Sequence, residues 1–113
     1  MQLEATKYLY DIQQAAAGIA QFTAHTDFEQ YHENAMLRAA VERQFEIIGE
    51  ALSQLARLDQ AVVARISEHR RIIAFRNILI HGYADVDDRV VWDIIQEKLP
   101  VLRREVEALL TEK

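Results

Sequence analysis

The sequence predicts an all-α protein, and three observations support this prediction. Average usage would give a chain of this length about 13 glycines and prolines together, whereas its 113 residues include 3 Gly and 1 Pro. Apolar residues recur at helical spacing rather than in the alternating pattern of strands. Half of the residues are hydrophobic, which is enough for one compact core. We therefore expect a single helical domain over residues 1–113, and the composition disfavours turn-rich β-sandwiches and barrels.

The first two helices are expected at residues 2–24 and 27–32. The first has the apolar face of an amphipathic bundle helix, formed by Leu3, Leu9, Ile12, Ala16, Ile19 and Phe22. Thr26 and Glu29 have the spacing of a capping box, which marks the start of a second, brief helix after a break at His25.

A long helix is expected from Asn34, a good N-cap residue, to Leu58. Its apolar seam faces the core and consists of Leu37, Val41, Phe45, Ile48, Leu52 and Leu55. The opposite face is polar, with side chains at three- and four-residue spacing, and carries Glu42, Arg43, Glu46 and Glu50. Glu50 is also a candidate to pair with an arginine across the bundle or across a dimer.

The next two segments are delimited by capping residues. Asp59 caps a short segment up to about Ile66, and Ser67 opens the helix that follows. That helix should end near His81, because Gly82 suits the left-handed position after a helix. A final helix is expected from about residue 86 to residue 110, with its cap and first acids supplied by Asp85, Asp87 and Asp88, and with a kink or break at Pro100.

Absent residue types exclude several kinds of protein. The chain has no cysteine, so a disulfide scaffold, a zinc–thiolate site and a thiol nucleophile are excluded, and a reducing cytoplasm is the natural compartment. Glu4 and Asp11 stand where a signal peptide would be basic and then apolar. No window approaches about 18 uncharged apolar residues. We expect a cytoplasmic protein that does not cross or target a membrane.

The net charge of −5 argues at first against a polyanionic partner, because nucleic-acid binders are usually basic. The charge is unevenly distributed along the chain. Residues 1–59 hold 9 acids and 4 bases, residues 85–113 hold 8 acids and 5 bases, and residues 60–84 hold 1 acid and 4 bases. The basic segment 60–84 is therefore the part suited to a phosphate backbone, with Arg65, Arg70 and Arg71 available for contacts.

Arg76 lies in the middle of the apolar face of the helix that is expected to end near Gly82. On a helical wheel, Ile72 and Ile80 flank it at about 40° on either side, so a guanidinium occupies a position suited to a core residue. A charge there must be paired or used. Two interpretations stay open, namely a structural ion pair or snorkelling arginine and a functional cation.

His81 follows five residues later, which on an ideal helix is about 140° away from Arg76. One straight helix cannot point both side chains at one ligand. They converge if the helix unwinds at Gly82, or if two copies pair around a twofold axis. A histidine at this position also complements the helix dipole without any further role.

Arg76, His81 and Tyr83 suit the cleavage of RNA without a metal. In that reaction the 2′-hydroxyl attacks the adjacent phosphorus, so no external nucleophile is needed. A histidine can move the proton near neutral pH, and an arginine matches the non-bridging oxygens of the phosphorane. The Arg-x4-His spacing by itself is weakly specific.

The string Arg76-Asn-Ile-Leu-Ile-His81-Gly-Tyr83 is similar to the Arg-x4-His-x-Tyr motif of the HEPN superfamily, specifically of the HepT-like ribonuclease toxins. Other stretches agree with this family in order and spacing across essentially the whole chain: 8–12, 46–51, 91–92 and 99–100. The resemblance implies an antiparallel four-helix bundle with a short extra helix. It also implies a homodimer with a cleft that is lined by both copies of the motif.

The resemblance further implies a metal-independent endoribonuclease toxin without a cofactor, acting on RNA such as tRNA or mRNA. In this scheme His81 is the general acid or base, Arg76 stabilises the phosphorane, and Asn77 supports substrate or motif geometry. The implied partner is a MntA-type minimal nucleotidyltransferase antitoxin, which binds the homodimer in a hetero-oligomer. It uses ATP to transfer AMP to the motif tyrosine, here Tyr83, which adds bulk and negative charge at the cleft. From the residues alone, Tyr83 equally suits packing after the helix end.

One rival hypothesis from another class stays open, namely a non-catalytic helical interaction module that only binds a nucleotidyltransferase. It predicts partner binding without RNA cleavage. A di-iron site is not supported, because Glu29 and His32 have the Glu-x-x-His spacing but such a site needs a second copy and two more inward glutamates. This pair is expected on a solvated short helix.

Overall fold

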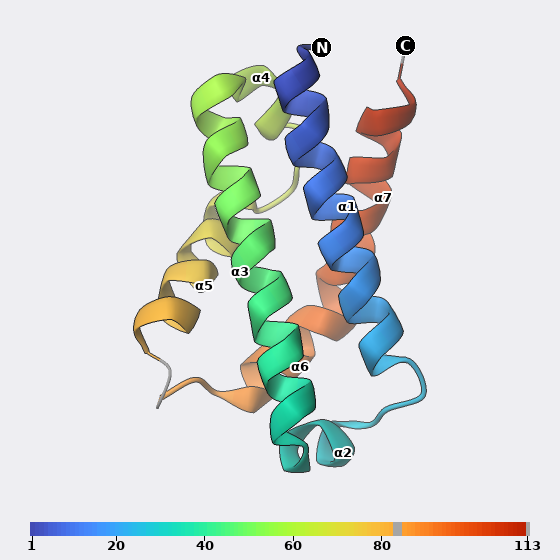
Figure 1. Cartoon of the computed structure of the whole chain (residues 1–113), viewed down its shortest axis with the longest axis vertical. Coiled ribbons are helices and arrows are strands. Elements are labelled where there is room, and N and C mark those ends of the chain that lie inside the picture. Colours follow the sequence, from blue (N-terminus) through green and yellow to red (C-terminus); the bar gives the residue numbers. More distant parts are fainter. Residues whose placement is uncertain (83–84, 113) are drawn as a thin grey trace.

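A computed structural model describes residues 1–82 and 85–112. These residues form seven helices and no strand: α1 (Leu3–Thr23), α2 (Phe28–Glu33), α3 (Ala35–Leu58), α4 (Gln60–Val63), α5 (His69–His81), α6 (Asp88–Glu97) and α7 (Leu99–Thr111). Figure 1 shows that α1, α3, α5 and α7 run alternately down and up the bundle, with α6 leading into α7. The predicted all-α, antiparallel four-helix architecture is confirmed.

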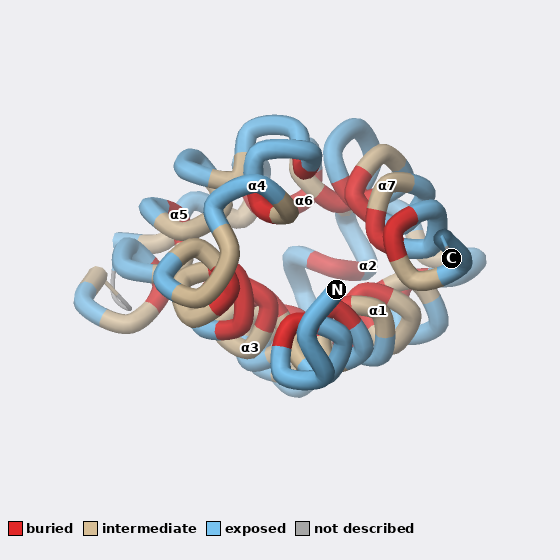
Figure 2. The backbone as a smooth tube through the Cα atoms, turned by 90° about the horizontal axis from the view of Figure 1, so that it is seen from above, coloured by how far each residue is buried: buried red, intermediate tan, exposed pale blue. Residues whose placement is uncertain are grey.

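The long helix α3 is the centre of one wall of the bundle. It packs between α1 and α5, and α1 packs in turn against α7. Seen from above, the order around the bundle is α5, α3, α1, α7, with buried segments facing inward (Figure 2). Helix α6 crosses the end of the bundle at which α2 lies, and it contacts α2. Helix α5 therefore lies at an edge, with α3 as its main support.

The core is apolar and draws on every long helix. Its largest fully buried side chains are Tyr31, Leu9, Ile12, Ile19, Ile48, Leu52, Leu55, Ile66 and Leu109. The predicted seam of α3 is buried except for Leu37, which is half-buried. Leu3 and Phe22, predicted on the apolar face of α1, are exposed in its terminal turns. None of the helices in the described ranges is long and apolar enough to span a membrane.

Side chains cap the helices mostly where the sequence predicts. Asn34 Oδ1 accepts a hydrogen bond from the Leu37 N–H at 3.0 Å, and Asp59 Oδ1 accepts one from the Val62 N–H at 3.1 Å. The capping box of α2 is displaced by one residue, because Asp27 and Gln30 form it in place of Thr26 and Glu29. Aspartate is the stronger N-cap residue of the two candidates.

Two predictions about the ends of α5 are wrong. Ser67 does not cap α5, because its N–H and Oγ both donate to the carboxylate of Glu105, at 2.9 and 2.7 Å. Gly82 has φ −111° rather than a left-handed conformation, and its N–H donates to the Ile78 carbonyl, which closes the helix in the ordinary way. Helix α6 begins at Asp88, two residues later than expected, and two of the predicted acids have the predicted roles: Asp87 is its cap and Asp88 lies in its first turn.

The predicted break of the last helix at Pro100 is confirmed. Helix α6 ends at Glu97, and Pro100 lies in the first turn of α7. A proline is tolerated there because the first N–H groups of a helix have no partner within that helix. The break creates a corner at Lys98 that faces the start of α5.

Candidate functional site

Arg76 is held against α3 by an unusually close approach of two helices. A Cβ atom built on Gly49 would lie 2.3 Å from the Cβ of Arg76 and 2.7 Å from its Cγ. Real Cβ atoms do not come so close to other carbons, so only glycine fits at this position of α3. A glycine inside a helix costs about 1 kcal/mol relative to alanine. A glycine in the interior of a predicted helix is therefore the feature of the sequence that indicates such a contact.

The guanidinium of Arg76 has two partners and remains partly accessible. Its Nη2 lies 2.6 Å from Glu50 Oε2 in an ion pair, and its Nη1 donates to Asn77 Oδ1 at 3.2 Å. Gln54 Nε2 donates to the other oxygen of Glu50 at 3.0 Å. The side chain of Arg76 is 27% exposed. The prediction that Glu50 pairs with an arginine across the bundle is confirmed, and the pairing leaves the guanidinium within reach of a ligand.

A hollow of about 240 Å³ lies beside this ion pair. Helices α1, α3 and α5 line it through Tyr8, Asp11, Arg43, Glu46, Ile47, Glu50, Ala51, Gln54, Arg76 and Ile80. Three of the stretches on which the family resemblance depends, near residues 8–12, 46–51 and 76–83, therefore contribute side chains to one place. The contributions of α1 and of Gln54 could not be identified from spacing, because they depend on how the helices pack.

His81 lies apart from this hollow. It is the last residue of α5 and is exposed, and it is not among the residues that line the hollow. Because α5 stays helical through His81, it is about 140° from Arg76 around the helix axis. One copy of the chain therefore does not bring the two side chains together. Asn77 is adjacent to Arg76 and exposed, and Tyr83 lies outside the described residues.

Carboxylates partly neutralise the basic segment 60–84. Arg65 donates two hydrogen bonds to Glu112, at 2.8 and 2.6 Å. These bonds raise the pKa of Arg65 and lower that of Glu112. Arg71 pairs with Glu68 at 3.0 Å. Within the described ranges, Arg70 is exposed and makes no ion pair, so it is the member of the predicted RNA-contacting set with the least compensated charge.

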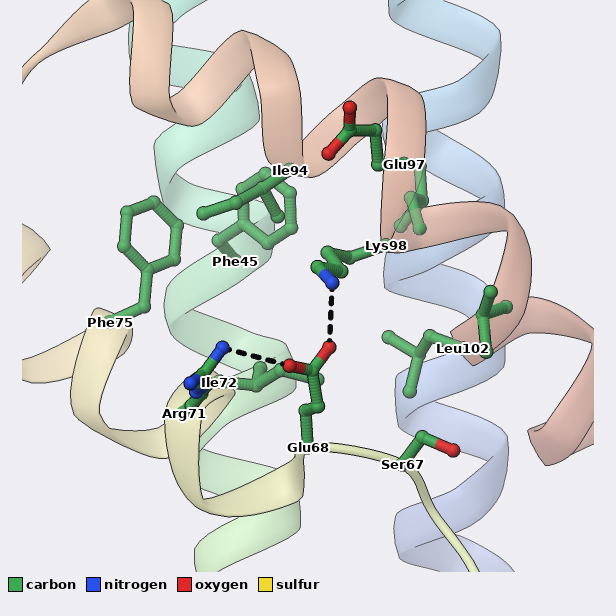
Figure 3. Close-up of a pocket in the computed structure, with 12 residues that line it drawn as sticks. Phe45, Ser67, Glu68, Arg71, Ile72, Phe75, Ile94, Glu97, Lys98 and Leu102 are labelled. Carbon is green, nitrogen blue, oxygen red and sulfur yellow. Dashed lines mark hydrogen bonds and ion pairs between the residues drawn. The ribbon is translucent and has the colours of Figure 1, made fainter.

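Figure 3 shows a second hollow, of about 300 Å³, between the start of α5 and the corner of α6 and α7. Its floor is apolar and includes Phe45 and Phe75, with ring centroids 5.5 Å apart in an edge-to-face arrangement. At its rim, Glu68 accepts a hydrogen bond from Arg71, and its other oxygen lies 2.9 Å from Lys98 Nζ (Figure 3). The hydrogen bond with Lys98 is the main reason that the pKa of Glu68 is lowered. Of the predicted site residues that the structure describes, only Arg71 borders this hollow.

A polar cluster joins α2, α3 and α6 near the start of α3. His32 Nδ1 lies 2.8 Å from Asp88 Oδ2, and Arg38 Nε lies 3.7 Å from the same oxygen. His32 thus contacts Asp88, and Glu29 is not part of this contact. In the described part of the chain, no three His, Asp or Glu side chains are grouped so that they could hold a metal ion.

Comparison with known proteins gives a consistent assignment. The family model described as Ribonuclease HepT-like matches residues 12–109. The chain is 37% identical over 100 residues to a protein of Methanocaldococcus jannaschii named "Putative RNase MJ1380", covering 88% of this chain and 91% of that one. It is 35% identical over 102 residues to "Probable ribonuclease HepT" of Thermococcus cleftensis, covering 90% and 92% of the two chains. No solved structure matches. The chain belongs to the HepT-like ribonuclease family.

Proposed function

We propose that this protein is a metal-independent endoribonuclease with Arg76 and His81 at its reaction centre. The observation that carries the proposal is an intact Arg-x4-His-x-Tyr string in a HepT-like ribonuclease chain, with its Arg76 accessible at a hollow. The family supports the general class of reaction. The Arg-x4-His-x-Tyr motif supports the choice of Arg76 and His81 as the residues of the reaction centre.

The proposed reaction uses the substrate's own hydroxyl group as the nucleophile. A base takes the proton of the 2′-hydroxyl, whose oxygen forms a bond to the adjacent phosphorus. The bond from phosphorus to the 5′-oxygen breaks, and that oxygen receives a proton. The products are a 2′,3′-cyclic phosphate and a 5′-hydroxyl. His81 is the general acid or base in this scheme, because a histidine can donate or accept a proton near neutral pH. Arg76 stabilises the phosphorane oxygens.

Two copies of the chain are part of the proposal. Arg76 and His81 of one copy face directions about 140° apart on a helix that does not unwind before His81. In a homodimer, Arg76 of one copy and His81 of the other can act on the same phosphate. Mixing the inactive variants Arg76→Ala and His81→Ala should then restore part of the activity, since each mixed dimer contains one intact pair. Mixed samples as inactive as the separate variants would contradict the shared site.

The test of the two roles is RNA cleavage by purified protein in the presence of a chelator. Arg76→Ala and His81→Ala are each expected to lower kcat by about a hundredfold or more. Arg57→Ala and His25→Asn are matched controls, because both positions are exposed and lie outside the hollow; asparagine tolerates the positive φ of His25. Cleavage that is equally fast in wild type and in the Arg76 and His81 variants would remove both roles.

The proposal extends to a toxin–antitoxin pair. The partner is a MntA-type nucleotidyltransferase that uses ATP to attach AMP to Tyr83, which lies outside the described residues. Incubation with that partner and ATP should add the mass of AMP to the wild type but not to Tyr83→Phe. A full mass gain in Tyr83→Phe would place the modification elsewhere. Partner binding without any RNA cleavage or toxicity is the outcome expected for a non-catalytic interaction module.

A further inference from the structure

Two neighbouring residues of α3 constrain one side chain of α5. Gly49 lies against the base of the Arg76 side chain, at distances that leave no space for a methyl group. Glu50, the next residue, is paired with the guanidinium at the other end of the same side chain. We propose that Glu50 is a positioning residue, which fixes the orientation in which Arg76 meets the phosphate. This inference rests on the proposed function, in which Arg76 stabilises the phosphorane.

The contact with Gly49 fixes the stem of the arginine but not its head. The atoms nearest to Gly49 are the Cβ, Cγ and Cδ of Arg76. The bonds beyond Cδ still allow the planar guanidinium to turn, and arginine has a large conformational freedom to lose. A second constraint is needed to hold the plane. Glu50 supplies it at Nη2, and Asn77 supplies a weaker one at Nη1.

The pairing leaves donors free for a phosphate. A guanidinium carries five N–H donors. The Nε of Arg76 is buried and has no hydrogen-bond partner among the described residues. Each Nη carries two hydrogens, so one hydrogen on Nη2 and one on Nη1 remain after the contacts with Glu50 and Asn77 are made. Guanidinium N–H groups pair with the non-bridging oxygens of a phosphate.

Glu50 is itself held in place. Its Oε2 faces Arg76 and its Oε1 accepts from Gln54, one turn further along α3. Its side chain is 48% exposed, and an ion pair with this exposure contributes little to folding. A pair that is geometrically fixed on both oxygens but adds little to stability is better suited to orienting the guanidinium than to holding the helices together. The helices are held together instead by the close contact between Gly49 and the stem of Arg76.

The experiment compares steady-state kinetics of RNA cleavage for Glu50→Gln, Glu50→Asp and Glu46→Gln. Glu46 lines the same hollow and pairs with Arg43 at 3.6 Å, so Glu46→Gln removes the same charge without touching Arg76. Glu50→Gln is expected to lower kcat by about tenfold to a hundredfold relative to Glu46→Gln. KM should stay the same or fall in both variants, because a negative charge is removed near a polyanion. Glu50→Asp keeps the charge and should recover part of kcat.

A spectroscopic measurement separates this inference from the proposed function. The Nε–H signal of Arg76 in an isotope-labelled sample reports how ordered its side chain is, whether or not the protein cleaves RNA. We expect an ordered signal in wild type and Glu46→Gln and a more mobile one in Glu50→Gln, with unchanged helix content.

An ordered Arg76 in Glu50→Gln, or equal kcat in Glu50→Gln and Glu46→Gln, would overturn the positioning role. A higher kcat in Glu50→Gln than in wild type would overturn it too, because Glu50 would then compete with the phosphate. If instead Arg76 loosens in Glu50→Gln while Arg76→Ala cleaves RNA at the wild-type rate, the proposed function fails and the positioning contact stands.

Discussion

Replacing Gly49 with alanine tests the close contact between α3 and α5. The added Cβ would lie 2.3 and 2.7 Å from two stem atoms of Arg76, and stem atoms cannot move aside without moving α5. Overpacking costs about 1–3 kcal/mol, and we expect the upper end of that range because the atoms in conflict are not at a flexible tip. The better helix propensity of alanine offsets about 1 kcal/mol. The net expected loss is therefore about 2 kcal/mol, or about 8 °C in Tm.

Gly18 provides a matched control for this substitution. It also lies inside a helix, but a Cβ built on it has no neighbour closer than 3.8 Å, the Cζ of Phe22. Gly18→Ala should therefore raise the free energy of unfolding by about 0.5–1 kcal/mol. Both variants are compared with wild type by urea unfolding at one protein concentration, since a homodimer's stability depends on concentration. Equal stability of Gly49→Ala and Gly18→Ala would refute the helix contact described for Arg76.

Further predictions concern a carboxyl, a phenol and two arginines. Burial, together with the carboxylates of Asp88 and Glu46, raises the pKa of Glu42 above its ordinary value of 4.5. The folded state therefore binds this proton more tightly, and the group lowers stability as pH rises from 4.5 through the raised value. Glu42→Gln should then raise the urea midpoint more at about pH 7 than at about pH 4, and an equal effect at both would contradict the shift. The Tyr31 hydroxyl is buried without a partner in the described structure, so Tyr31→Phe should leave the free energy of unfolding unchanged or raise it by about 1 kcal/mol; a clear loss in urea unfolding would show that the hydroxyl has a partner. In RNA-binding titrations at several salt concentrations, Arg70→Ala should reduce the salt dependence by about one counterion. Arg65→Ala should reduce it less, because its guanidinium already pairs with a carboxylate, and equal reductions would argue against that difference.

Most of the helical architecture could be predicted from local signals. Asn34 and Asp59 cap helices where the sequence predicts, and the break near Pro100 follows from its missing N–H. The failed prediction for Ser67 shows a tertiary contact overriding a local preference. Ser67 binds a carboxylate of α7 instead of capping α5, because the loop before α5 packs near that helix. Glu68 has φ 57°. This left-handed conformation could not be predicted, because the usual sign of it in a sequence is a glycine.

The candidate site could be predicted in its residues but not in its arrangement. Helical spacing places Arg76 on an apolar face, and the sequence offers Glu50 as a candidate to pair with an arginine across the bundle or across a dimer. Both belong to the observed ion pair. Spacing cannot show that Gly49 admits the arginine stem, nor that Tyr8 and Asp11 of α1 complete the hollow. These features depend on the distance between helices, which no single helix encodes. The family resemblance adds the dimer and the partner enzyme, and both remain proposals.

The central claim is that this chain cleaves RNA through the 2′-hydroxyl with the help of Arg76. The most direct test is end-group analysis of a short RNA cleaved by the wild type and by Arg76→Ala in excess chelator, beside the same RNA with a single 2′-deoxy nucleotide at the cleaved position. We predict 2′,3′-cyclic phosphate and 5′-hydroxyl ends from the wild type, a loss of cleavage at the deoxy position, and little product from Arg76→Ala. Products with 5′-phosphate ends, cleavage at the deoxy position, or full activity in Arg76→Ala would contradict the claim.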